Sequence, residues 1–182
     1  MSKLITPEFR GSFVHILEPH APKAAPGEAQ QKARYQITIP LAKDNKFWDE
    51  VQKLVVDTAT AKWGKIPPKL KSPIKDGDAE GRAEFEGKMT IQATSNNKPD
   101  IVGTNLKPIM EASEIYSGAW YRCSVRAYAW EHPTGGKGVS IALDNVMKVR
   151  DDEAFSGRSS AEDDFVGFGA ADSSDSGDDL LG

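Results

Sequence analysis

The sequence of 182 residues has little of what builds covalent or metal cross-links. It contains one cysteine, Cys123, and three histidines. One cysteine cannot form an internal disulfide, and with three scattered histidines it does not match the ligand spacing of a zinc site. We therefore expect a protein of a reducing, cytoplasmic compartment that holds no metal.

Long apolar runs are also missing. No stretch approaches the roughly 20 apolar residues of a membrane span, and the first residues, 1–7, contain a lysine but no apolar run typical of a signal peptide. The sequence thus predicts neither export nor a membrane partner.

Motifs of enzymes are absent or incomplete. The glycine-rich run 135–138 lacks the spacing of a phosphate-binding loop, because Gly138 stands where a Ser or Thr would hold magnesium. Residues 76–81 resemble the start of a calcium loop, but its twelfth position is Gly87 instead of Glu. We expect no catalytic residues, no cofactor and no enzymatic activity.

The charge is strongly segregated along the chain. Residues 1–150 hold 22 Lys and Arg against 17 Asp and Glu, a net of +5, whereas residues 151–182 hold one Arg and ten acids, a net of −9. This predicts a folded basic domain over 1–150 and a disordered acidic tail over 151–182. A basic body suggests a polyanionic ligand, with which the tail would compete; the alternative is a tail that only adds solubility.

Two apolar islands interrupt the acidic tail. Each follows a pair of acids, and their candidate partner-binding residues are Phe165, Phe168, Asp178, Asp179, Leu180 and Leu181. Acids that steer and apolar residues that dock are what a short partner-binding peptide needs. We expect these islands to recruit other proteins.

The body reads as mainly β. Alternating patterns predict strands over 10–17, 34–40, 88–94, 119–130 and 139–150, with a short one at 101–102. Helical spacing from Phe47 to Trp63, after possible caps at Asp44 and Asn45 and before Gly64, predicts one main helix. Few helices between the strands favour an antiparallel sheet, so we expect a small closed or partly closed barrel like an OB-fold.

The most informative strand is 120–130. Tyr121 and its alternate neighbours are suited to a core, while the opposite face carries three aromatic side chains and two arginines: Trp120, Arg122, Arg126, Tyr128 and Trp130. Aromatic rings stack on unpaired bases and arginines bind phosphates, whatever the base. The alternative is that a loop or the helix covers this face and acids pair with its arginines.

Neighbouring segments add further basic candidates. Lys148 and Arg150 end the partner strand, Lys137 lies in the glycine-rich loop between the two, and Arg34 begins the polar face of 34–40. With the aromatic strand they form the predicted DNA-binding set.

Several short blocks also resemble one protein family. They are Gly11–Val14, Tyr35–Pro40, Lys62–Gly64, Lys75–Asp78, Tyr116–Gly118, Arg122–Val125, Gly136–Val139, Leu143–Val146, and Ser159, Ala161, Asp164 and Phe165. In this order they resemble the single-stranded DNA-binding proteins of tailed phages, once classed as a domain of unknown function. The resemblance implies an OB-fold, a role in phage DNA replication or recombination, and a location in the host cytoplasm. Such tails commonly end in an aromatic residue, whereas this chain ends in Leu181 and Gly182, so Phe165 and Phe168 would have to substitute.

The sequence thus favours a non-catalytic protein that binds single-stranded DNA with little sequence preference, with duplex DNA or RNA as weaker ligands. Its tail would recruit replication or recombination proteins. Two alternatives remain: a recombination protein that anneals strands or tolerates duplex DNA, and a virion assembly protein in which the aromatic face contacts protein. Salt separates the virion assembly protein from both DNA-binding hypotheses, because binding to phosphates weakens steeply as salt rises, whereas an apolar protein interface does not weaken in this way.

Overall fold

A computed structural model describes residues 2–155 and Phe165. Its strands are β1 (Leu4–Ile5), β2 (Phe9–Arg10), β3 (Ser12–His20), β4 (Arg34–Ala42), β5 (Lys75–Asp76), β6 (Lys88–Ser95), β7 (Asp100–Val102), β8 (Trp120–His132) and β9 (Gly136–Arg150). Its helices are α1 (Phe47–Trp63) and three short 3-10 turns, η1 (Gly77–Glu80), η2 (Ala83–Phe85) and η3 (Ala112–Glu114). No helix in this part of the chain is long and apolar enough to cross a membrane.

All nine strands belong to one sheet. Its order is β1-β8-β9-β6-β4-β3, while β2 lies beside β8, β5 beside β6, and β7 beside β9. In the residues described, no pairing joins β3 to β1, so the sheet is not closed into the predicted barrel. β9 also runs parallel to β6 and to β7. The mainly β fold with one main helix is confirmed, but the sheet is mixed.

The helix follows the sequence pattern closely. The Asn45 side-chain oxygen accepts a hydrogen bond from the Phe47 backbone N–H at 2.9 Å. At the other end, Gly64 adopts φ 74° and donates its backbone N–H to the Thr60 carbonyl. A left-handed residue at this position favours glycine, which explains why the helix ends there.

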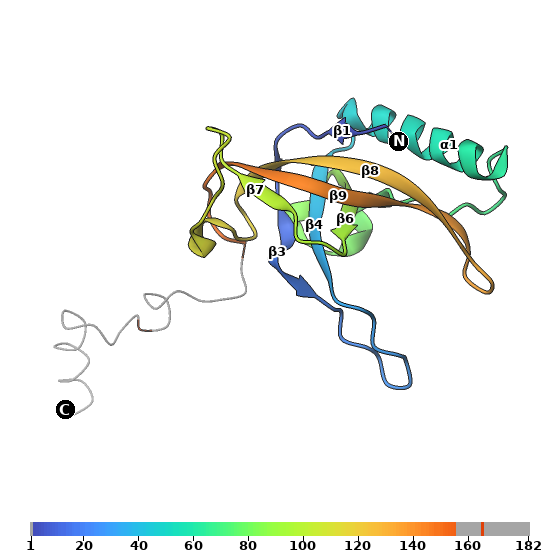
Figure 1. Cartoon of the computed structure of the whole chain (residues 1–182), viewed down its shortest axis with the longest axis horizontal. Helices are drawn as coiled ribbons and strands as arrows, with labels where there is room; N and C mark the ends of the chain where they lie inside the picture. Colours follow the sequence, from blue (N-terminus) through green and yellow to red (C-terminus); the bar gives the residue numbers. More distant parts are fainter. Residues whose placement is uncertain (1, 156–164, 166–182) are drawn as a thin grey trace.

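The core lies between α1 and one face of the β8–β9 hairpin (Figure 1). Val51 and Ala59 of the helix are fully buried, as are Tyr121 and Val125 of β8. This agrees with the predicted alternation, which assigned the odd-numbered residues of β8 to the core. The opposite face of the hairpin does not belong to this core.

One strand is longer than expected. Proline lacks a backbone N–H, so the run from residue 10 was expected to stop near Pro19, but β3 continues to His20. Because β3 is the last strand in the sheet order, one of its edges has no partner strand in the described part of the chain, and a proline is tolerated there. The β3–β4 hairpin therefore projects from the sheet as an arm, on the same side as the tip of the β8–β9 hairpin (Figure 1).

Candidate nucleic-acid interface

A groove crosses the polar face of the sheet. Strand register aligns Gln36 of β4 with Thr94 of β6, and Thr94 with Ala142 of β9. Residues paired in this way point to the same face. Above them lie three hollows of about 530, 490 and 260 Å³, which we call the first, central and third hollows.

The hollows are continuous because neighbouring ones share residues. The first and central hollows share Arg34, Thr94 and Tyr128. The central and third hollows share His20, Pro22, Gln36 and Gln92. The groove therefore runs from the β8–β9 hairpin across β6 and β4 to the base of the β3–β4 arm.

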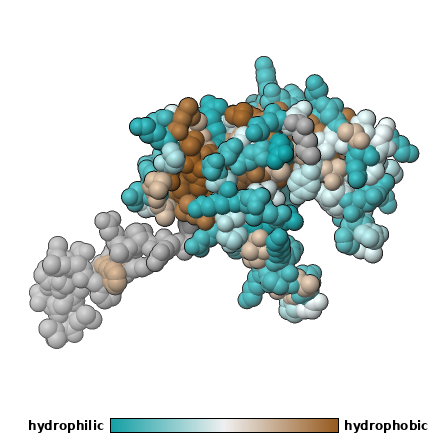
Figure 2. Space-filling model, in the orientation of Figure 1, coloured by the Kyte–Doolittle hydropathy of each residue, from teal (hydrophilic) through white to brown (hydrophobic). Residues whose placement is uncertain are grey.

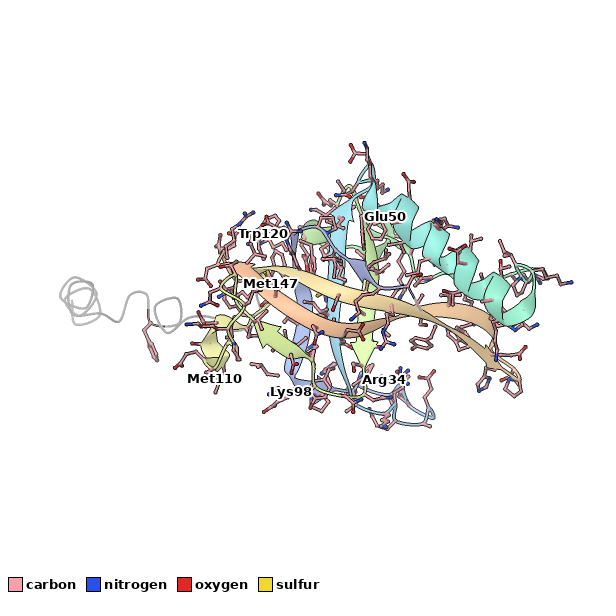
Figure 3. The ribbon with its side chains drawn as sticks, turned by 45° about the horizontal axis from the view of Figure 1, so that its top comes forward. Arg34, Glu50, Lys98, Met110, Trp120 and Met147 are labelled. Carbon is pink, nitrogen blue, oxygen red and sulfur yellow. The ribbon has the colours of Figure 1, made fainter. Side chains whose placement is uncertain are left out.

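Tyr128 and Arg34 occupy the middle of the groove. Tyr128 is half-buried on β8 and lines both the first and the central hollow, and exposed Arg34 faces it from the start of β4. Lys98 lies beside the first hollow, and Figure 3 shows it at the same edge of the molecule as Arg34. An aromatic ring between cations suits a nucleic-acid strand, whose bases stack and whose phosphates pair with cations.

Arg126 also lines the first hollow, but its charge is already paired. Its guanidinium donates three hydrogen bonds of 2.7–3.0 Å to Asp144, and the Lys3 ammonium lies 3.6 Å from the same carboxylate. These hydrogen bonds lower the pKa of Asp144 below its ordinary value. The alternative in which an acid pairs with an arginine of this face therefore holds for Arg126, although its side chain remains 42 % exposed.

Trp130 and Lys137 lie at the tip of the β8–β9 hairpin. The indole N–H of Trp130 donates to the Ser140 hydroxyl at 2.9 Å, and Ser140 lines the central hollow. Lys137 points elsewhere: its ammonium lies 3.3 Å from a Glu131 carboxylate oxygen and 5.4 Å from the Trp63 ring centroid. Trp130 thus lies at the border of the central hollow without lining it, whereas Lys137 lies at the neighbouring end of α1.

The other four predicted residues lie at the far end of the hairpin, outside the three hollows: Trp120, Arg122, Lys148 and Arg150. Arg150 lies 4.3 Å from the Trp120 ring centroid and 3.3 Å from Glu8, which also faces Arg122 at 4.0 Å. Figure 3 shows Trp120 well away from Arg34. A strand of 13 residues extends about 40 Å, so one alternating face reaches several separate surfaces.

Lys148 is buried, contrary to the expectation of an exposed basic strand end. Only 6 % of its side chain is exposed, and its ammonium lies 2.5 Å from the Asp151 carboxylate. The cause is an irregularity in β9: Val125 pairs with Leu143, but Ser124 pairs with Asn145, so Asp144 is an extra residue. A bulge of this kind moves the following side chains to the other face, and Lys148 turns toward the core beside Tyr121.

The first residues of the acidic tail lie against the body. Asp151 contacts Lys148 and Tyr116, and Asp152 accepts a hydrogen bond from the Trp120 indole at 2.8 Å. These contacts lower the pKa of both carboxyls. The folded part therefore extends past Arg150.

Arg10 holds the same segment from the other side. Its guanidinium donates to the Glu153 carbonyl and lies 4.4 Å from the Phe155 ring centroid. We call residues 151–155 the tail root. Of the predicted partner-binding residues, Phe165 is exposed, and Phe168, Asp178, Asp179, Leu180 and Leu181 lie outside the described part of the chain.

Several groove residues were not among the predicted set. Gln36, Gln92 and Thr94 form its floor, and Lys3 and Lys98 lie at its first hollow. The alternation of 34–40 had assigned Gln36 to a polar face, but only the pairing of β4 with β6 brings it near Tyr128. Within the described residues, no group of three or more His, Cys, Asp or Glu is placed to hold a metal.

The chain is similar to known phage proteins. The sequence profile of a family described as the single-stranded DNA-binding protein of Enterobacter phage Enc34 matches residues 2–181. A curated relative, protein p50 of Acyrthosiphon pisum secondary endosymbiont phage 1, is 26% identical over 159 residues, which cover 81% of this chain and 83% of p50.

Solved structures with a similar fold include two phage proteins. The single-stranded DNA-binding protein of bacteriophage Enc34 in complex with single-stranded DNA has a TM-score of 0.72 at 26% identity, covering 85% of this chain and 89% of that one. The bacteriophage T7 single-stranded DNA-binding protein gp2.5 has a TM-score of 0.59 at 14% identity, covering 88% and 98%. At that identity the second comparison concerns the fold alone.

Proposed function

Because the chain belongs to the family of the phage Enc34 single-stranded DNA-binding protein, we propose that it binds single-stranded DNA without catalysis and with little sequence preference. The observation that carries this proposal is the groove. Tyr128 and Arg34 line both its first and its central hollow, and Lys3 and Lys98 line the first hollow. The solved complex of the Enc34 protein with single-stranded DNA supports it.

The chemistry of the groove suits a strand of any sequence. Arg34 and Lys98 would neutralise phosphates, and the Tyr128 ring would stack on a base. The floor adds amides and hydroxyls, which can both donate and accept hydrogen bonds, from Gln36, Gln92 and Thr94. Such groups accommodate different base edges, so affinity would depend on the backbone and on stacking.

We further propose that the acidic tail competes with DNA and recruits partner proteins. The tail root supports the first part, since Asp152 contacts Trp120 and Arg10, an aromatic and a cation of the kind that would bind DNA. The phage relatives support a role in phage DNA replication, recombination or repair in the host cytoplasm. The apolar residues beyond the root, such as exposed Phe165, are the candidates for partner contact.

The test is a titration of the full chain with oligo-dT, with duplex DNA and with RNA of equal length, at two salt concentrations. The proposal expects the tightest binding to oligo-dT and a steep loss of affinity for it at the higher salt. Equal affinity for duplex DNA would favour the duplex-tolerant recombination protein. No salt-sensitive binding to any of the three ligands would overturn the proposal and favour the virion assembly protein.

A further inference from the structure

We infer that the third hollow is a second base-binding subsite, in which Phe13 and Arg82 hold one base of the strand. The inference rests on the proposed function and names a contact separate from Tyr128. It follows from four observations on the far end of the groove: a strained aromatic residue, a cation over its ring, a rigid supporting segment and a polar floor that leads from the central hollow.

Phe13 has an unusual backbone. Its φ is 49°, in the left-handed region that a bulky side chain rarely adopts. Strain of this kind persists only where the surrounding structure enforces it, and it clusters at ligand sites. Here the backbone turn places the Phe13 ring in the lining of the third hollow, half-buried and 6.4 Å from Phe85 beneath it.

Arg82 covers the ring. Its guanidinium carbon lies 4.4 Å from the Phe13 centroid, and a Glu84 carboxylate oxygen 3.5 Å away holds it in place. Nearly half of the Arg82 side chain, 48 %, is still exposed. Bases stack on guanidinium planes as well as on aromatic rings, so the pair offers a stacking surface with a positive charge for the adjacent phosphate.

The segment that carries Arg82 is tied firmly to the sheet. Asp78 accepts hydrogen bonds from the Lys43 ammonium and from the Gly87 backbone N–H, at 2.6 and 2.8 Å. Gly77 packs so closely that a Cβ there would lie 2.4 Å from the Phe85 carbonyl oxygen. Arg82 is therefore positioned before any strand arrives, which reduces the entropy lost on binding.

The floor of the hollow favours a base over a phosphate. Thr38, Thr90 and Gln92 offer neutral hydroxyls and an amide, and the Glu80 carboxylate lies in the same lining. A carboxylate repels phosphate but accepts hydrogen bonds from base amino groups. Lys75, also in the lining, supplies a cation for the backbone outside.

The subsite continues the groove. His20, Pro22, Gln36 and Gln92 line both the central and the third hollow. A strand that passes Tyr128 and follows the floor toward the arm would therefore reach Phe13. A short oligonucleotide could occupy only one of the two positions, whereas a longer one would bridge them.

The experiment measures the affinity of oligo-dT of increasing length for Phe13→Leu, which removes the ring but keeps an apolar side chain. We expect wild-type affinity for the shortest oligonucleotides that bind through Tyr128, and a loss of about tenfold for longer ones. Phe13→Tyr, which keeps the ring, should restore binding at every length. Tyr128→Leu is the matched control and should weaken binding at all lengths.

Photocrosslinking adds a direct readout. We would use a series of oligo-dT strands, each with one 5-iodouracil at a different position. Crosslinking to the peptide that contains Phe13 is expected only when the modified base lies near one end of the strand. Wild-type affinity of Phe13→Leu at all lengths, with Tyr128→Leu still weakened, would overturn the subsite and leave the proposed function intact. A wild-type chain that does not bind oligo-dT would overturn both.

A second variant separates binding from folding. Phe13→Gly removes the ring and relieves the backbone, because glycine adopts positive φ at little cost. If its thermal midpoint stays near that of the wild type while long oligo-dT binds about tenfold less tightly, the ring is needed for binding. Unfolding of Phe13→Gly together with full binding by Phe13→Leu would assign Phe13 to packing and overturn the inference.

Discussion

At the scale of single residues, Trp130 is placed by a glycine on the opposite strand. Gly138 pairs with Trp130, and a Cβ on Gly138 would lie 2.3 Å from the indole ring. Any larger residue would push the indole off the hairpin and away from Ser140. The position of the ring, as well as its presence, can therefore be tested.

We predict that Gly138→Ala weakens oligo-dT binding almost as much as Trp130→Ala, which should cost about 1–3 kcal/mol if the indole stacks on a base. Tryptophan fluorescence titrations would measure both, with Gly135→Ala in the nearby loop as a control for hairpin flexibility. Full affinity in Gly138→Ala and in Trp130→Ala would show that the groove ends at Tyr128.

Arg126 allows a second test at this scale, because its partner acid lines the same hollow. Asp144→Asn removes the negative charge that holds Arg126 and Lys3. We predict tighter oligo-dT binding and a steeper dependence on salt, since up to two cations become available to phosphates. Ser140→Ala, in the neighbouring hollow, should leave the salt slope unchanged, and an unchanged slope in Asp144→Asn would place the DNA elsewhere.

A third prediction at this scale concerns pH. His15 stacks on His20 with ring centroids 4.1 Å apart, and burial, followed by the neighbouring His20, lowers the pKa of His15 below 6.5. The unfolded chain then binds more protons than the folded one near that pH. Stability should therefore be full above pH 6.5 and fall as the pH drops toward the lowered pKa.

Thermal midpoints at pH 5.5 and pH 7.5 would measure this effect. Glu18, Lys98 and Glu111 line the hollow beside His15, so the comparison needs a variant that changes only the imidazole. His15→Gln should reduce the difference between the two midpoints, and an equal difference in the wild type and in His15→Gln would assign it to the acids.

At the scale of elements, the tail root is the part of the chain that most changes the predicted organisation. Composition alone placed the end of the body at Arg150, because residues 151–155 are acidic like the rest of the tail. Their contacts with Arg10 and Tyr116 join residues more than 30 positions apart in the sequence. Local composition carries no information about contacts between residues so far apart in the sequence.

Two truncations would separate the root from the rest of the tail. A chain ending at Phe155 should keep the wild-type thermal midpoint and bind oligo-dT more tightly at low salt, since seven acids are removed. A chain ending at Arg150 should unfold at a lower temperature, because buried Lys148 loses its carboxylate partner. Calorimetry and titration at two salt concentrations measure these effects; equal midpoints would make the root dispensable.

The elements differ in how well the sequence predicts them. The helix and the strands β4, β6, β8 and β9 follow local periodicity, so their positions were expected to within a few residues. The two-residue strands β1, β2 and β5 exist only because distant strands offer free edges, as when Leu4 pairs with Val125. No local pattern marks them.

The residues of the candidate site also differ in how well the sequence predicts their positions. The alternation of β8 appears in the structure: Arg126 and Tyr128 line the groove, and Trp130 donates a hydrogen bond to Ser140 at its border. The floor comes from the pairing of β4 with β6, and the bulge at Asp144 turns Lys148 inward. Both depend on register between strands, which a single sequence does not reveal.

At the scale of the whole molecule, two surfaces of different chemistry lie next to each other. The groove is polar and basic, whereas Figure 2 shows an apolar patch over β7 and the loop after it, on the side where the tail leaves the body. Val14, Leu17, Ile109, Met110 and Ile115 line a hollow there. Lys98 lines both this hollow and the first hollow of the groove, so an oligonucleotide that reaches Lys98 would lie at the border of the patch.

The open sheet has a consequence for how a DNA strand would enter the groove. The groove lies on one face of the sheet, between the β3–β4 arm and the β8–β9 hairpin, and is not the interior of a closed barrel. A strand can be laid in sideways, so no free end has to be threaded. Circular and linear single-stranded DNA of equal length should then load at equal rates in stopped-flow fluorescence, and gaps inside a duplex would be as accessible as its frayed ends.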